Sequence, residues 1–135
     1  MPMRSDDLYL VDIIESADAL QAMTSSASAE AFHEDEILRS AALWQLYILA
    51  EAAAKLSSSA RTRLAAVPWD DVRAFRNRMA HGYFTLDWAR VWEIVRHSVP
   101  PLAKQAEALL AESFPEAHRS LIERRKERKP HPHEG

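Results

Sequence analysis

Apolar residues recur at spacings of three and four along most of the chain, which is the pattern of helices with one buried face. The first run predicts a helix over residues 5–23, and its members are Leu10, Ile13, Ile14, Ala17 and Leu20. A denser run predicts a helix over residues 35–56, and its members are Ile37, Leu38, Ala41, Leu43, Trp44, Tyr47, Ile48 and Ala52. This second run is too apolar for a surface helix, so we expect it to be the central helix of the fold.

Capping residues and prolines mark the shorter elements that follow. Ser28 is a predicted N-cap for a short helical turn. A short helix is predicted over residues 60–66, after a run of three serines. Pro68 then begins a helix over residues 69–80, because proline is well tolerated in the first turn of a helix. Gly82 is predicted to end that helix as a C-terminal cap.

The last third of the chain is predicted to be helical as well. Asp87 is the expected N-cap of a helix that the pair Pro100 and Pro101 stops. Two further helices are predicted over residues 102–114 and 115–128. The sequence therefore predicts an all-α fold, an up-and-down helical bundle.

The chain shows no internal repeat and no linker long enough to divide it. We expect residues 1–128 to form one domain and residues 129–135, which are rich in proline and histidine, to be a disordered tail. Residues 1–7 lack the apolar core of a signal peptide, and the apolar stretch over residues 41–56 is too short to span a bilayer. We therefore expect a cytoplasmic protein with no membrane partner.

Composition removes several classes of site. The 135 residues include no cysteine, which excludes disulfides, zinc–thiolate sites and cysteine nucleophiles. The only two glycines are Gly82 and Gly135, so a Gly-rich phosphate-binding loop cannot form. Residues 1–60 carry three basic and ten acidic side chains, and residues 61–135 carry fourteen and ten. The second half could therefore attract an anionic ligand, although ordinary scatter of charge explains the asymmetry equally well.

One predicted helix carries an unusual group of polar residues. Arg73, Asn77 and His81 are spaced four apart, so their side chains follow one side of the helix. Arg76 precedes His81 by five residues, which places the two about 140° apart around an ideal helix. They can act on one point only if the helix end distorts or if a second copy supplies the other half, as in a symmetric dimer. Gly82 would permit a turn that brings Tyr83 beside His81.

These residue types suit the cleavage of RNA without a metal. An imidazole such as His81 can take a proton from a ribose 2′-hydroxyl or give one to the departing oxygen. The guanidinium of Arg76 can bind a phosphate as negative charge builds on it. Asn77 can orient the imidazole or donate to phosphate, and Arg73 and Arg78 are candidate RNA-binding residues, although solvated arginines are commoner. No metal site and no cofactor are predicted.

The run Arg76-Asn77-x-x-x-His81-x-Tyr83 resembles the HEPN signature, in the variant found in HepT toxins. The resemblance extends over residues 5–112, and it departs from the family at Ala50, where a glycine is common. Further matches are Pro68-Trp69, Leu86-Asp87, Val91-Trp92, the early Tyr9-Leu10-x-Asp12-Ile13 and Glu51-Ala52.

The resemblance implies a homodimer of HEPN-type bundles in which paired motif helices form a cleft that cuts RNA, either mRNA or tRNA. It implies the toxin of a type VII-like toxin–antitoxin system, a metal-independent endoribonuclease in which Arg76, Asn77 and His81 are catalytic. It also implies a cognate minimal nucleotidyltransferase, the antitoxin, which adds AMP to Tyr83.

Three alternatives stay open from the sequence. The protein could be a non-catalytic HEPN partner or substrate of a nucleotidyltransferase. Glu51 could be a buried partner for a motif arginine or an ordinary exposed glutamate. The basic helix over residues 115–128 could touch RNA, but its interleaved acidic residues favour a solvated helix face.

Overall fold

A computed structural model describes residues 5–81 and 86–128, and it contains no strand within those ranges. The predicted all-α class is therefore confirmed. The helices are α1 (Asp6–Thr24), α2 (Ala29–Glu34), α3 (Glu36–Ala54), α4 (Ser58–Arg63), α5 (Trp69–His81), α6 (Trp88–Glu93), the π-helical turn η2 (Ile94–Ser98), α7 (Val99–Ser113) and α8 (Pro115–Glu127).

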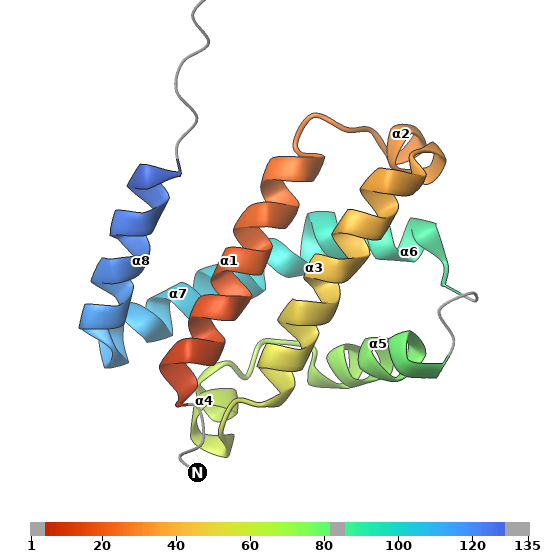
Figure 1. The fold of residues 1–135 in the computed structure, drawn as a ribbon. Coiled ribbons are helices and arrows are strands. Elements are labelled where there is room, and N and C mark those ends of the chain that lie inside the picture. The colour runs from red at the N-terminus through yellow and green to blue at the C-terminus, as the bar shows by residue number, and fades with distance from the viewer. Residues whose placement is uncertain (1–4, 82–85, 129–135) are drawn as a thin grey trace, which may run out of the picture.

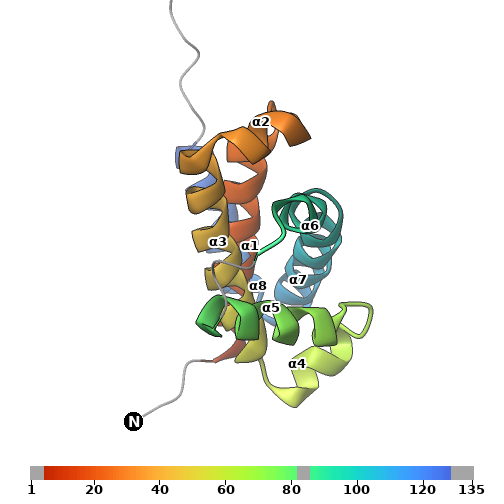
Figure 2. The same cartoon turned by 90° about the vertical axis from the view of Figure 1, so that its right-hand side faces the viewer.

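The long helices α1 and α3 lie side by side and run in opposite directions (Figure 1). Helices α6 and α7 form a second layer that crosses behind this pair, and α8 packs beside α1 and α7 (Figures 1 and 2). Helix α5 crosses the C-terminal end of α3. The core between the layers includes the fully buried side chains of Leu10, Ile13, Ile14, Phe32 and Leu110.

Side-chain caps begin four of the described helices. The side-chain oxygens of Ser28, Asp35 and Asp87 each accept a hydrogen bond from a backbone N–H in the first turn of α2, α3 and α6. Ser57 does the same for α4, which consequently begins at Ser58 and ends at Arg63 rather than covering residues 60–66. The helix before the run of three serines ends at Ala54, and the first serine of that run caps α4.

The prediction that Pro100 and Pro101 stop a helix is wrong. The chain stays helical from Trp88 to Ser113, and the prolines lie in the first turn of α7, immediately after the wider turn of η2. A proline lacks the N–H that bonds to the preceding turn, and its ring clashes with the carbonyl there. Because the turn widens to the π form just before the prolines, the helix continues past them.

Helix α3 packs against α1 and α5, but it is not buried all round. Leu43, Leu46 and Leu49 are buried, whereas Ile37 is 83% exposed and Trp44 is 60% exposed. The dense apolar run therefore supplies both a core face and an open face. The prediction that this run is too apolar for a surface helix is therefore wrong for one side of α3, which is exposed.

The basic residues of α8 are largely used in contacts with acidic residues of α1 and α7. Arg125 donates to Asp18 and to Glu107 at 2.9 Å, and Arg128 lies 3.0 Å from Glu15. Leu121 on the same helix is fully buried. These contacts favour a structural role for α8 over RNA binding.

Some predictions lie outside the described residues. They are the capping role of Gly82, the position of Tyr83 and the character of the tail over residues 129–135. Within the described ranges, no helix is long and apolar enough to cross a membrane.

Candidate functional site on helix α5

Helix α5 is held against the fold by one apolar side. Its first residue, Trp69, donates from its indole Nε1 to the carbonyl oxygen of Leu64 at 3.2 Å. Val72 and Phe75 pack against the core as half-buried side chains. Because these three residues share one side of α5, the polar residues between them face outward.

The candidate residues of the predicted motif lie on the exposed sides of α5. Asn77, Arg78 and His81 are exposed. The Arg73 side chain is 69% exposed, and its guanidinium lies 3.7 Å from the carboxylate of Asp70 in a loose surface pair. Asn77, His81 and Arg73 can therefore reach a large ligand without any rearrangement of the core.

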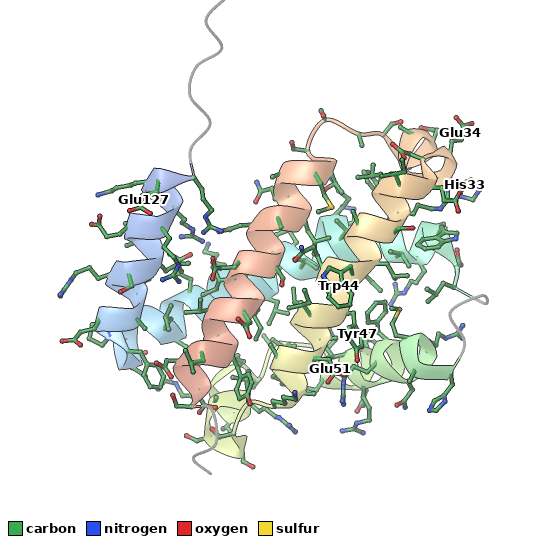
Figure 3. The ribbon with its side chains drawn as sticks, in the orientation of Figure 1. His33, Glu34, Trp44, Tyr47, Glu51 and Glu127 are labelled. Atoms are coloured by element: carbon green, nitrogen blue, oxygen red, sulfur yellow. The ribbon has the colours of Figure 1, made fainter. Side chains whose placement is uncertain are left out.

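Arg76 is held differently from its neighbours. Its Nε donates to Oε1 of Glu51 at 2.9 Å, and the two side chains are only 35% and 27% exposed. Glu51 comes from α3, where it follows Trp44 and Tyr47 along the helix towards α5 (Figure 3). Of the two readings that the sequence left open for Glu51, the structure supports the partner of a motif arginine. The bond uses Nε, so the two terminal nitrogens of the guanidinium keep donors for an anion.

One copy of the chain does not bring Arg76 and His81 to the same point. Helix α5 is α-helical through His81, so these residues stand about 140° apart around the axis and about 7.5 Å apart along it. The distortion of the helix end that would align them does not occur within α5 up to His81. The other alternative from the sequence is a second copy that supplies the missing group, and this geometry is compatible with it.

A third arginine, which the sequence analysis did not identify as a candidate, lies near Arg73 and Arg76. Arg61 of α4 lines a hollow of about 90 Å³ with Arg73 and Arg76, and Trp69 forms part of the wall. Arg61 is twelve or more residues from the others in sequence, so no local spacing could have indicated the cluster. The remaining linings come from Ala54 and Val72.

The two tryptophans that follow Asp87 have a structural role. The ring of Trp92 lies 5.1 Å from that of Phe32, and the ring of Trp88 lies 6.3 Å from it. Both rings therefore pack against the core as partly buried side chains. Among residues 5–81 and 86–128, no group of three or more potential metal ligands comes together.

The chain is similar in sequence to several proteins that are named as ribonucleases. A protein named "Putative RNase MJ1380" from Methanocaldococcus jannaschii is 31% identical over 107 residues, which are 79% of this chain and 98% of that protein. "Putative RNase TTE0752" from Caldanaerobacter subterraneus is 29% identical over 108 residues, covering 80% of this chain and 96% of the relative. "Probable ribonuclease HepT" from Thermococcus cleftensis is 27% identical over 106 residues, with 78% and 96% covered.

No solved structure matches the chain. The family model described as ribonuclease HepT-like matches residues 13–109, a range that includes Glu51 and all of α5. The match covers well over half of the chain and agrees with the all-α fold. The protein therefore belongs to the family of HepT-like ribonucleases.

Proposed function

We propose that the protein is a metal-independent endoribonuclease and the toxin of a type VII-like toxin–antitoxin system. The observation that carries the proposal is the exposure of Asn77 and His81 on the same helix as a guanidinium, Arg76, that is held in place by Glu51. Membership of the HepT-like ribonuclease family and relatives named as ribonucleases support the same reaction.

In the proposed reaction, His81 takes the proton of a ribose 2′-hydroxyl as that oxygen attacks the adjacent phosphorus. The bond from phosphorus to the 5′-oxygen breaks, and the departing oxygen receives a proton from the imidazolium that His81 has become. The products are a 2′,3′-cyclic phosphate and a 5′-hydroxyl, so no water or metal enters the bond-breaking step. Arg76 stabilises the charge that develops on the phosphate, and Asn77 orients the imidazole.

A homodimer is part of the proposal because one copy separates Arg76 from His81. An apolar stripe on α3 offers a surface for the second copy, and its members are the exposed Ile37, Ala41 and Trp44 and the half-buried Ile48. These positions are spaced by four, three and four, so they lie on one side of α3. Glu51 continues the same side, which brings the stripe up to the ion pair with Arg76. A partner seated on the stripe would therefore reach the site.

The activity is tested by incubating purified protein with single-stranded RNA in the presence of a chelator. The unmodified protein is expected to cut the RNA, and His81→Ala and Arg76→Ala are each expected to lower the rate by a factor of about 10² or more. His97→Ala is the matched control, because His97 is an exposed histidine on η2, outside the proposed site. Equal rates for all four proteins would refute the proposal. RNA binding without cleavage would instead favour a non-catalytic partner of a nucleotidyltransferase.

The shared site is tested by mixing the two inactive variants. If each site takes Arg76 from one copy and His81 from the other, a mixed dimer of His81→Ala and Arg76→Ala contains one intact site. Random re-association should then restore about a quarter of the original activity, because half of the dimers are mixed and each has one of two sites. No restoration, with exchange of subunits verified, would show that each copy carries a complete site.

We propose that a cognate minimal nucleotidyltransferase regulates the enzyme by adding AMP to Tyr83. The bulk and negative charge of the nucleotide would then occupy the place that the RNA phosphate needs beside His81. Co-expression with such an enzyme, followed by intact-mass measurement, should show the added nucleotide on the unmodified protein and not on Tyr83→Phe. The same mass gain on both proteins would place the modification elsewhere.

A further inference from the structure

Packing of the fold does not require the three arginines Arg61, Arg73 and Arg76 to line one hollow. It has a volume of about 90 Å³ and lies between the end of α3, helix α4 and the first turns of α5. Three guanidinium groups line it, and no carboxylate belongs to its lining among the described residues. Like charges placed together lower stability unless a ligand of opposite charge uses them, so the hollow is suited to an anion.

Arg61 is positioned by contacts that leave most of its donors available. Helix α4 is fixed because Ser57 donates to Asp6 from its backbone N–H at 2.9 Å and from its hydroxyl at 2.6 Å. The Arg61 guanidinium donates through one nitrogen to the carbonyl oxygen of Ala54 at the C-terminal end of α3. It also lies 5.8 Å from the centre of the Trp69 ring. A guanidinium has five N–H donors, so several can still bind a ligand.

The charges around the hollow are only partly balanced. Glu51 is paired with Arg76, and the fully accessible Asp70 is loosely paired with Arg73, which leaves an excess of one positive charge. A second hollow on the other side of α5 contains Arg78 and Arg90, but Asp71 and Asp87 line it too. Its charges balance, so the three-arginine hollow is the better site for an anion.

We propose that this hollow binds a backbone phosphate of single-stranded RNA, next in the strand to the phosphate that Arg76 holds for cleavage. The proposal rests on the proposed function and adds Arg61 and Arg73 as substrate-binding residues. A phosphate offers several acceptor oxygens to convergent guanidinium groups. Arg73 precedes Arg76 by three residues, less than one turn of α5, so a strand bound in the hollow would continue directly to the phosphate that Arg76 holds.

The test measures the binding of a single-stranded 2′-deoxy oligonucleotide, which keeps the phosphates but lacks the attacking hydroxyl. The dissociation constant is measured at several salt concentrations for the unmodified protein and for Arg61→Gln. Loss of one phosphate contact should reduce the magnitude of the slope of log affinity against log salt by about 0.7 for a single strand. Affinity at low salt should fall by a factor of about ten.

Two further variants separate charge from structure. Arg63→Gln removes the same charge from the same helix, but Arg63 pairs with the exposed Glu112 outside the hollow, so its slope and affinity should be unchanged. Arg61→Lys keeps the charge while changing the contact with Ala54, so it should keep most of the slope. If Arg61→Gln behaves like Arg63→Gln, or if Arg61→Lys loses as much as Arg61→Gln, the proposed phosphate site is overturned.

The result of the oligonucleotide-binding test does not depend on whether the protein cuts RNA. Oligonucleotide binding that depends on Arg61, in a protein with no ribonuclease activity, would support the phosphate site and refute the catalytic proposal. Cleavage that depends on His81, with binding that is indifferent to Arg61, would do the reverse. With active protein, Arg61→Gln should raise the KM for RNA about tenfold and leave kcat nearly unchanged, because it removes binding that substrate and transition state share.

Discussion

Replacing Glu51 by glutamine should separate the positioning of Arg76 from its charge. The Glu51–Arg76 contact is a charge-assisted hydrogen bond of 2.9 Å between side chains that are 27% and 35% exposed. Such bonds contribute roughly 1.5–3 kcal/mol when well shielded, and exposed pairs contribute roughly 0–1 kcal/mol. For this half-buried pair, a loss of about 1 kcal/mol in the free energy of unfolding is expected. The melting temperature should then fall by about 3–5 °C.

The effect on catalysis should exceed that small effect on stability. In this variant the Arg76 guanidinium keeps its charge, but only a neutral amide oxygen remains to accept from its Nε, so it is held less firmly in one orientation. We expect kcat for RNA cleavage to fall about tenfold with little change in KM, which is less than the loss of about 10²–10³ expected for removing a transition-state donor outright. Glu112→Gln is the matched control, because Glu112 forms an exposed ion pair with Arg63. It should change neither kcat nor stability.

A double-mutant cycle makes the reasoning refutable. If Glu51 acts only through Arg76, then Glu51→Gln should have no further effect on kcat once Arg76 has been replaced by alanine. The two losses would then be strongly non-additive. If instead the two reductions in kcat multiply in the double variant, Glu51 acts on RNA or on another residue. That result would refute a role for Glu51 in positioning Arg76.

Two predictions concern the fold itself. Phe32→Ala should lower the free energy of unfolding by roughly 3–5 kcal/mol, because the fully buried ring packs on Trp92; urea denaturation would measure this, and a loss below about 1 kcal/mol would contradict it. The hydrogen bond from Arg125 holds the pKa of Glu107 below its usual range, although burial opposes this. A lowered pKa stabilises the fold above the usual glutamate range, and this contribution is lost as the pH falls through the lowered value. The stability difference between the unmodified protein and Arg125→Gln should therefore shrink as the pH falls below the usual glutamate range, and a difference independent of pH would refute the assignment.

The parts of the fold that the sequence predicted are those with local causes. A cap depends on one side chain and a backbone N–H two or three residues later, so Ser28 and Asp87 could be recognised from the sequence. The prolines at 100 and 101 misled because their effect depends on the turn before them. A π-helical turn over Ile94–Ser98 accommodates the two prolines, and the sequence of that turn does not predict its π-helical form.

In the candidate site, too, some residues could be predicted from local sequence and others could not. The positions of Asn77 and His81 followed from helical spacing alone. Glu51 and Arg76 are 25 residues apart, so the sequence could only leave two roles open for the carboxylate until the packing of α3 against α5 was known. Arg61 belongs to a helix whose direction depends on the bonds from Ser57 to Asp6, which are 51 residues apart. A contact that depends on the whole fold leaves no mark on local spacing.

The way in which the arginines are held has a consequence for RNA binding. Arg61 and Arg76 are each bonded to α3, one to the carbonyl of Ala54 and the other to the carboxylate of Glu51. The end of a helix carries partial negative charge on its free carbonyls, so it holds a guanidinium well. Both groups have therefore lost much of their conformational freedom before RNA arrives, and binding need not order them again. The exposed Arg73 has only a loose surface pair with Asp70, and His81 has no bond to α3 among the described residues. A strand that binds first to Arg61 and Arg76 would then bring its neighbouring phosphates to these less ordered residues.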